Sequence, residues 1–302
     1  MKQTVFGGVE FGGTKVVCAV ATSPDHILEE STYPTSTPDE TIPCILQFFV
    51  DQQIKTGKLA ALGIASFGPL DLKPHSPSFG QIISTPKKVW EGIDIIHPFQ
   101  NAFNIPVYLD TDVNGAALGE WLIGSARGLS TILYMTVGTG IGMGAIISGK
   151  FLHGFNHPEY GHIRIPHNLE QDPFTGSCPY HGDCLEGLAS GSAMQMRWSL
   201  QPEKLPNDHQ AWELEAQYLA YAITNLILSF SPERIILGGG IMHHLGLVEK
   251  IKQGTTKLIN GYENLTEKEI NQMIVEPLLG NRAGVCGAIG FAMQVYAQSL
   301  SN

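Results

Sequence analysis

The sequence of 302 residues predicts an α/β protein with two hydrophobic cores around a cleft. Two observations indicate this class. Short β-rich segments alternate with segments of helical periodicity along the whole chain. In addition, a strand, a glycine-rich turn and a second strand follow one another both at the start and near the middle of the chain. A composition with 43% hydrophobic residues would fill one large core, but two cores fit this repeated arrangement better.

The first of these units opens the chain. Strands are expected over residues 4–9 and 16–21, with a glycine-rich turn over 11–15. Apolar residues at helical spacing predict a helix over 39–56, and a buried strand is expected over 61–65. The next stretch, 68–98, is rich in Pro, Ser and Gly. It predicts a long functional loop, because compact domains seldom keep idle loops of that length.

The second half of the chain is expected to repeat the opening pattern. In order, the predicted elements are a strand over 107–109, a helix from Asp112 to Trp121, a strand over 131–137, a turn over 138–142, a strand over 145–147, a helix over 213–230, a strand over 234–237 and a final helix over 285–300. The strand over 234–237 leads directly into a triple glycine. Clustered glycines of this kind indicate that the backbone closely approaches another group.

Composition and charge exclude several classes of protein. The formal net charge of −10, without a cluster of Lys and Arg, argues against binding to nucleic acid. No apolar run approaches the roughly 18 residues of a membrane span. The five cysteines are odd in number and mostly scattered, and no signal-peptide pattern begins the chain. We therefore expect a soluble protein of the reducing cytoplasm.

Four residues have the spacing of metal ligands: His162, Cys178, His181 and Cys184. Cys and His together form closed tetrahedral sets around Zn²⁺, and such closed sets are structural rather than catalytic. Gly182 gives the short loop the freedom to wrap around an ion. The alternatives are reduced thiols with ordinary surface histidines, or a disulfide between the two cysteines, which the reducing compartment disfavours.

The glycine clusters were compared with known phosphate-binding patterns. Gly8 and Gly13 have the spacing of a P-loop, but Thr14 precedes Lys15, which is the wrong order. The segment 140–145 nearly matches a dinucleotide fingerprint, yet a strand and not a helix follows it. Two hairpins with Gly and Thr at their tips can instead offer backbone N–H groups and hydroxyls to one nucleotide's phosphates from both sides of a cleft.

Four motifs, in the same order, give the chain a resemblance to a known family from end to end. They are Gly7-Gly-Val-Glu-Phe-Gly-Gly-Thr-Lys15, Asp110-Thr-Asp-Val-Asn-Gly-Ala-Ala-Leu-Gly-Glu120, His157-Pro-Glu-Tyr-Gly-His162 and the loop from Cys178 to Glu186. The chain resembles the ROK family of sugar kinases, in its fructokinase branch.

This resemblance implies an actin-like ATPase (ribonuclease H-like) fold, with two α/β domains flanking a cleft in which ATP and a hexose meet. The smaller domain is expected to comprise residues 1–115 and 283–302, and the larger one residues 116–282 with the zinc loop. The resemblance also implies a possible homodimer.

Asp112 and Glu10 are the expected catalytic carboxylates. Asp112 lies where a strand ends and a helix begins, and it is expected to accept the proton of the sugar hydroxyl, because the helix N-terminus favours its ionised form. Glu10 is expected to order Mg²⁺ through water. From the residues alone, Asp112 could be a helix cap and Glu10 a solvated charge at a strand end.

The other site residues follow from matches to the family motifs. Glu159 and Glu186 resemble carboxylates that bind sugar hydroxyls, and His162 could offer one nitrogen to zinc and the other to the sugar. Thr111 completes the expected sugar site. The expected ATP-binding residues are Glu10, Gly12, Gly13, Thr14, Lys15, Gly138, Thr139, Gly140, Gly238, Gly239 and Gly240. A plain tight turn is the alternative for the last three.

The resemblance favours phosphorylation of D-fructose to fructose 6-phosphate. Many members of the family place Asn before the catalytic Asp and use a different zinc loop, whereas this chain has Thr111 and Cys-Pro-Tyr-His-Gly-Asp-Cys, as fructokinases do. Mannose, glucose or N-acetylmannosamine are alternative acceptors. The rival classes are a sugar-responsive repressor, for which we expect no room ahead of Gly7, and a sugar sensor without catalysis.

Overall fold

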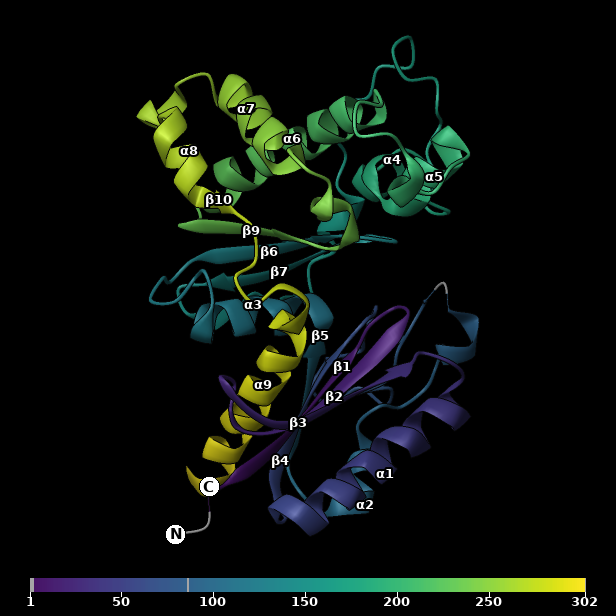
Figure 1. The fold of residues 1–302 in the computed structure, drawn as a ribbon, viewed down its shortest axis with the longest axis vertical. Coiled ribbons are helices and arrows are strands. Elements are labelled where there is room, and N and C mark those ends of the chain that lie inside the picture. The colour runs from purple at the N-terminus through teal and green to yellow at the C-terminus, as the bar shows by residue number, and fades with distance from the viewer. Residues whose placement is uncertain (1–2, 86, 302) are drawn as a thin grey trace. The chain divides into compact units, whose positions relative to one another are not determined.

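The computed structural model describes residues 3–85 and 87–301 (Figure 1). Contacts divide the chain into two compact units. Unit 1 comprises the described residues up to Gly128, the segment Phe151–His157, and the residues from Leu278 onward; unit 2 comprises Leu129–Lys150 and Pro158–Pro277. The predicted boundaries at 115 and 282 differ from this division. The helix that begins at Asp112 packs along the C-terminal helix, so both lie in unit 1.

Unit 1 is built on a five-stranded sheet in the order β3-β2-β1-β4-β5. The first three strands are antiparallel, and β4 and β5 run parallel to β1. Parallel neighbours place the C-terminal ends of β1, β4 and β5 at the same edge of the sheet. The strands are β1 (Val5–Phe11), β2 (Lys15–Ser23), β3 (His26–Pro34), β4 (Leu59–Ser66) and β5 (Val107–Thr111).

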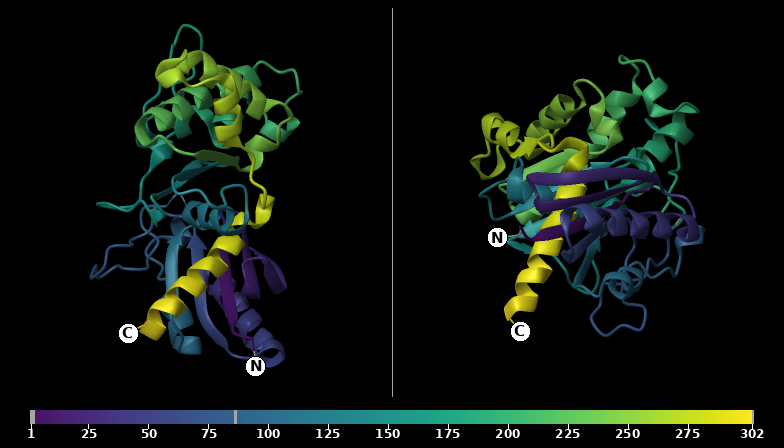
Figure 2. Two further views of the ribbon diagram at one scale, coloured as in Figure 1. Left: turned by 90° about the vertical axis from the view of Figure 1, so that its left-hand side faces the viewer. Right: turned by 60° about the horizontal axis from the view of Figure 1, so that its bottom comes forward.

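The side chains of β1 alternate between the two faces of this sheet and contribute to a core cluster on each face. Val9 and Phe11 belong to a core cluster with Phe49 of α1, whereas Phe6 packs with Ile289 of α9 in a second cluster. Figure 2 shows the yellow α9 running along the strands of unit 1, and α9 contacts β4, β1 and β2. The helices of unit 1 are α1 (Pro38–Thr56), α2 (His97–Phe103), α3 (Asp112–Ile123) and α9 (Ala283–Ser301).

The predicted loop over 68–98 is more ordered than its composition suggests. It contains the 3₁₀ helix η1 (Lys88–Trp90), two isolated β-bridges and the start of α2. Trp90 is fully buried against Phe11 and Phe67, and its indole N–H donates to the carbonyl of Ser36 at 2.8 Å. This anchor fixes the segment against the sheet of unit 1.

Unit 2 has a second five-stranded sheet in the order β10-β9-β6-β7-β8. Its strands are β6 (Ile132–Val137), β7 (Ile141–Ile147), β8 (Lys150–Phe151), β9 (Arg234–Gly238) and β10 (Ile274–Val275). Its helices are α4 (Leu185–Ala189), α5 (Gly191–Trp198), α6 (Ala211–Phe230), α7 (Leu247–Ile259) and α8 (Glu267–Met273). The 3₁₀ helices of the rest of the chain are η2 (Tyr160–His162), η3 (Pro202–Lys204), η4 (Gly240–His243), η5 (Tyr262–Asn264) and η6 (Gly280–Arg282).

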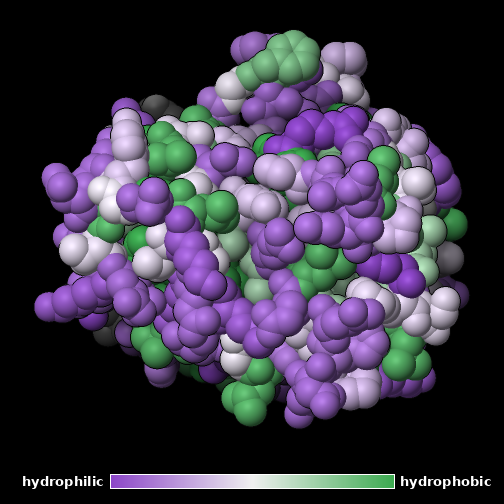
Figure 3. All heavy atoms as spheres, turned by 90° about the horizontal axis from the view of Figure 1, so that it is seen from above, coloured by the Kyte–Doolittle hydropathy of each residue, from purple (hydrophilic) through white to green (hydrophobic). Residues whose placement is uncertain are grey.

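The helices of unit 2 pack on one another and on their sheet. The central helix is α6, which is largely apolar and contacts α7 and α4. In Figure 3, hydrophilic residues cover most of the face on which α4–α8 lie, with apolar residues scattered among them. Within the described residues, no helix is both long enough and apolar enough to cross a bilayer.

Candidate functional site

The first glycine-rich turn joins β1 to β2 in unit 1. The Gly12 N–H donates to the Lys15 carbonyl at 3.0 Å, and the Thr35 hydroxyl donates to the Gly12 carbonyl at 2.8 Å. Gly13 and Thr14 are exposed at the tip, and a Cβ added at Gly13 would meet nothing within 4 Å. The base of the turn is therefore fixed while its tip stays open to a phosphate-sized group.

The second glycine-rich turn joins β6 to β7 in unit 2, and the start of α5 supports it. The carbonyl of Gly138 accepts the Gly191 N–H at 2.7 Å, and the carbonyl of Thr139 accepts the Ser192 hydroxyl at 2.8 Å. Because these carbonyls are engaged, the shape of the turn is set by α5 as well as by the hairpin. The chain thus contains two hairpin turns of similar kind, one in each unit.

Asp112 lies at the first position of α3, directly after β5. Thr111 is the N-cap, and its hydroxyl oxygen accepts the Asn114 N–H at 3.2 Å. The Asp112 carboxylate accepts the N–H of Val113 at 2.9 Å, and burial raises the pKa of Asp112 to about 6. A carboxylate with this pKa is still mostly ionised at neutral pH and is a stronger base than an ordinary Asp.

Glu10 lies near the end of β1 at the same edge of the sheet. Burial, and then the nearby Asp112 carboxylate, raise the pKa of Glu10 to about 7, while the charge of Lys15 and then the N–H of Val285 at the start of α9 partly offset this shift. Its Oε2 atom is buried and has no hydrogen-bond partner among the described residues. A buried carboxylate whose pKa is raised by burial and by a second carboxylate nearby is typical of a functional site.

Four side chains of unit 2 form the predicted metal cluster. One donor atom from each of His162, Cys178, His181 and Cys184 lies within 4.8 Å of the others. Nδ1 of His162 is 3.7 Å from Sγ of Cys178 and 3.5 Å from Sγ of Cys184. Nδ1 of His181 is also 3.7 Å from Sγ of Cys178. The structure therefore brings these four residues together, and their binding of zinc stays a prediction.

These separations match the edges of a tetrahedron around a small cation. Zinc bonds to His nitrogen and Cys sulfur are about 2.0–2.3 Å long, so neighbouring donors should be roughly 3.6 Å apart. Gly182 has a φ of +64°, which lets the chain turn back between the two cysteines, and the backbones of Cys178 and Gly182 exchange two hydrogen bonds. The donor set, its spacing and its loop therefore fit one tetrahedral metal ion.

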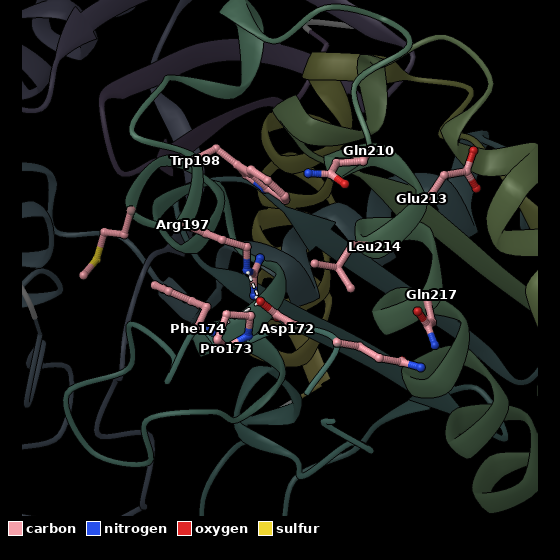
Figure 4. A pocket seen from close by; sticks show the side chains of 11 residues that line it. Asp172, Pro173, Phe174, Arg197, Trp198, Gln210, Glu213, Leu214 and Gln217 are labelled. Carbon is pink, nitrogen blue, oxygen red and sulfur yellow. Dashed lines mark hydrogen bonds and ion pairs between the residues drawn. The ribbon is translucent and has the colours of Figure 1, made fainter. Parts of the chain in front are cut away.

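A buried ion pair anchors the middle of the segment between His162 and Cys178. Asp172 lies next to a cavity of about 670 Å³ (Figure 4). Its carboxylate accepts the Tyr218 hydroxyl at 2.6 Å and pairs with the guanidinium of Arg197 at 3.0 Å. Arg197 in turn donates to the carbonyl of Leu188 at 2.8 Å. Sequence patterns do not reveal this anchor, since its partners lie 25 and 46 residues from Asp172 in the sequence.

Glu215, on α6 beside this anchor, provides a prediction about stability. Neither of its carboxylate oxygens has a partner among the described residues, and burial raises its pKa well above 4.5. Between pH 4.5 and that raised pKa the folded protein binds more protons than the unfolded chain, so stability should fall as pH rises. We expect Glu215→Gln to raise the melting temperature at pH 8 by at least about 2 °C and to change it little at pH 4.

Thermal unfolding at the two pH values, followed by circular dichroism, checks this expectation. Glu213→Gln is the matched control, because Glu213 is exposed on the same helix. A Glu215→Gln protein that is less stable than the parent at pH 8 would show that Glu215 is ionised and favourably placed.

The predicted sugar-binding residues of unit 2 lie around the metal cluster. Glu159 is exposed and immediately precedes η2, which ends at His162. Because Nδ1 of His162 faces the thiols, Nε2 lies on the opposite side of the ring. Glu186, two residues after Cys184, accepts the N–H of Ile141 at 2.9 Å. A Cβ at Gly140 would lie 2.6 Å from this carboxylate, so Glu186 links the segment that holds Cys184 to the second glycine turn.

The triple glycine has a packing role. A Cβ at Gly238 would lie 2.3 Å from the Tyr134 hydroxyl, and one at Gly239 would lie 2.3 Å from the Val137 carbonyl. Gly239 also has a φ of +96°. Of these three glycines, only Gly240 could carry a Cβ that meets nothing within 4 Å. Close packing against β6 therefore accounts for the first two glycines, and their contact with adenosine stays a prediction.

The predicted residues thus fall into two groups. Glu10, Thr111, Asp112 and the first turn lie in unit 1, whereas the metal cluster, Glu159, Glu186, the second turn and the triple glycine lie in unit 2. Lys15, the last residue of the first motif, is exposed at the start of β2 and acts on Glu10 electrostatically. Pattern reasoning did not include Asp110 and His153, which contact each other beside Asp112.

Comparisons with known proteins agree with this geometry. The family model described as "ROK family" matches residues 6–295. A fructokinase of Zymomonas mobilis is 43% identical over 96% of this chain and 97% of its own length, and a fructokinase of Pediococcus pentosaceus is 39% identical over 94% and 96%. The crystal structure of a ROK hexokinase from Thermus thermophilus has the same fold, with a TM-score of 0.79 over 99% of this chain and 100% of that chain, at 24% identity. The chain belongs to the ROK family, and the predicted actin-like fold of α/β units is confirmed.

Proposed function

We propose that this protein is an ATP-dependent fructokinase that transfers the terminal phosphoryl group of ATP to O6 of D-fructose. The observation that carries the proposal is the ionisable pair Asp112 and Glu10 beside the first glycine turn. Two curated relatives named fructokinase, with 43% and 39% identity over nearly the whole chain, support fructose as the acceptor.

In this proposal Asp112 is the general base. Phosphoryl transfer needs positioning, neutralisation of charge and a group that takes the proton of the attacking hydroxyl. Asp112 Oδ2 is free of the Val113 N–H, which occupies Oδ1, and it would receive the proton of the primary hydroxyl. The pKa of about 6 suits this role, because it lies near the working pH while leaving the carboxylate mostly ionised.

Glu10 would hold Mg²⁺ through water, and the exposed tip of the first turn would bind the phosphates. The buried Oε2 of Glu10, which has no hydrogen-bond partner among the described residues, fits a hydrated cation nearby. When bound, Mg²⁺ neutralises charge on the β- and γ-phosphates. Gly12, Gly13, Thr14 and Lys15 on one turn, and Gly138, Thr139 and Gly140 on the other, would contribute N–H groups and polar side chains.

Gly284 provides a test of the Glu10 assignment. A Cβ at this position would lie 2.3 Å from Cδ of Glu10, so Gly284→Ala must displace the carboxylate. We expect kcat/KM for Mg-ATP to fall at least about tenfold, although alanine favours the helix. Steady-state ADP release at varied Mg-ATP measures this effect. Gly154→Ala is the control, since a Cβ there meets nothing within 4 Å, and equal losses in both variants would remove Glu10 from the argument.

The sugar would be held by Thr111, Glu159, His162 and Glu186, together with Asp112. Carboxylates and an imidazole nitrogen accept or donate to several neighbouring hydroxyls at once. The Cys and His cluster would bind a structural zinc ion. That ion would bind Nδ1 of His162 and leave Nε2, on the other side of the ring, available for a sugar hydroxyl. It would also hold the loop that leads to Glu186 in place.

An ADP-release assay tests the proposed function. Fructose, mannose, glucose and N-acetylmannosamine are each supplied with Mg²⁺ and ATP, and the sugar phosphate is identified by its phosphorus NMR spectrum. We expect the highest kcat/KM with fructose and a product phosphorylated at O6. A higher kcat/KM with another hexose would show that this hexose, and not fructose, is the preferred substrate. Sugar binding without ADP release would identify a sensor and end the proposal.

A further inference from the structure

Asp110, the residue two positions before the proposed base, is a buried carboxylate. The residue is fully buried, and its side chain is only 1% exposed. Oδ1 accepts the N–H of Thr111 at 2.7 Å and the side-chain amide of Asn114, also at 2.7 Å. A carboxylate removed from water in this way is costly unless hydrogen bonds and a cation compensate for the loss of solvent.

These hydrogen bonds enclose Asp112. Asp110 reaches forward to Thr111 and Asn114, and the Thr111 hydroxyl oxygen accepts the backbone N–H of Asn114. Asp112 lies inside this short span, directly after the last residue of β5 and at the first position of α3. The direction in which its carboxylate points is therefore tied to the position of the Asp110 carboxylate.

The imidazole that faces Asp110 is supplied by a distant part of the chain. Nε2 of His153 lies 3.0 Å from Oδ2 of Asp110 and 3.4 Å from the side-chain nitrogen of Asn114. The Asp110 carboxylate at this short distance raises the pKa of His153, which favours the charged form of the imidazole. Among the described residues, the side chains in contact with this ring include Asp110 of β5, Asn114 of α3 and Phe151 of β8, and of these three only Asp110 carries a charge.

His153 belongs to a segment of unit 1 that connects two parts of unit 2. This segment, Phe151–His157, is fastened a second time by His157, whose Nε2 accepts the N–H of Leu70 at 3.1 Å. The chain then continues directly to Glu159 of the proposed sugar site. The backbone position of His153 is thus fixed by the packing of this segment in unit 1. Its side chain is nevertheless 37% exposed.

We propose that His153 is a positioning residue, which acts through Asp110 to hold Asp112 in line with the acceptor hydroxyl. This inference rests on the proposed role of Asp112 as the proton acceptor. Without His153, the Asp110 carboxylate must seek water, and the bonds to Thr111 and Asn114 loosen. A misplacement of the reacting group by about 1 Å can cost roughly 100-fold in rate.

The test compares His153→Ala with His153→Gln. Gln places its amide nitrogen near the position of Nε2 and can still donate to Asp110. We expect His153→Ala to lower kcat by about 10- to 100-fold, with little change in KM for Mg-ATP. The kcat of His153→Gln should be at least about tenfold higher than that of His153→Ala. A kcat in His153→Ala within twofold of the parent overturns the inference. So does a His153→Gln protein that folds but is no better than His153→Ala.

A matched control and a double variant separate positioning from general damage. His97 forms a similar pair with Asp94 elsewhere in unit 1, and His97→Ala should leave kcat unchanged. In an Asp112→Asn background, His153→Ala should change the residual rate less than about twofold, because no base remains to be positioned. A further loss as large as that in the parent would assign His153 a merely structural role.

The same set of variants distinguishes this inference from the proposed function. If Asp112→Asn retains normal turnover, the assignment of the base fails, and the positioning role fails with it. If Asp112→Asn is inactive while His153→Ala is normal, only the positioning role fails. Circular dichroism and thermal unfolding of each variant establish that the compared proteins are folded.

Discussion

Replacement of Asp112 by asparagine should lower kcat with fructose by about 1,000-fold and leave the fold intact. A positioned general base contributes roughly 10²- to 10⁴-fold to the rate, and the amide cannot accept the proton. The size and shape of the side chain hardly change, and asparagine can still accept the N–H of Val113 at the start of α3. We therefore expect similar KM values for ATP and fructose, since the lost interaction forms only in the transition state.

Steady-state ADP release at saturating fructose and Mg-ATP measures this loss. Asp94→Asn is the matched control, because Asp94 also accepts backbone N–H groups at the start of a helix, α2. The control should retain nearly full turnover. Turnover in Asp112→Asn within a few-fold of the parent would remove Asp112 from the mechanism.

Loss of one metal ligand should have the second-largest effect. Cys184 is fully buried, and its Sγ lies 3.5 Å from Nδ1 of His162. In Cys184→Ser the hydroxyl is a weaker ligand than a thiolate, so we expect the bound metal to fall from about one ion per chain to nearly none. Because metal binding in such sites contributes folding free energy, the melting temperature should fall by several degrees.

The metal content is measured by atomic emission and the stability by thermal unfolding. KM for fructose should also rise, because the Glu186 carboxylate lies two residues beyond Cys184. Cys44→Ser is the control, since Cys44 is exposed on α1, and all three quantities should stay unchanged. A parent protein that is purified without metal, and that neither binds zinc nor gains stability from it, would contradict the account.

Short-range patterns predicted much of the fold. The helix over 39–56 corresponds to α1, and the glycine turn near residue 13 joins β1 and β2. Hydrophobic periodicity explains this success, since both elements bury one face. The edge strand β3 was missed, because its side chains are mostly exposed or half-buried and show no strong alternation. Helix α8 was also missed, although Thr266 and Glu269 form a capping box, which is a readable signal in the sequence.

The residues of the site were predictable where a motif carries them. The four metal ligands were recognised by residue type and spacing, and η2 brings His162 to the loop that holds the other three. The pair formed by Asp110 and His153 could not be recognised, because 43 residues separate them and either residue alone is unremarkable. Gly238 shows that one pattern can have two explanations. The triple glycine indicated contact with a nucleotide, but the close packing of Gly238 against Tyr134 also requires a glycine.

The pH dependence of kcat/KM for fructose tests the central claim most directly, namely that the ionised Asp112 accepts the proton. The pKa of Asp112 is raised to about 6, and the base works only when ionised. The profile is measured at saturating Mg-ATP, because the bound cation would keep Glu10 ionised, whose own pKa is raised to about 7. We predict that kcat/KM is then level from neutral pH down to about 6 and falls tenfold per pH unit below it, and that the residual activity of Asp112→Asn lacks this fall. A profile that stays level to pH 5, or a fall that persists in Asp112→Asn, would contradict the account and assign the ionisation to another group, such as Glu10.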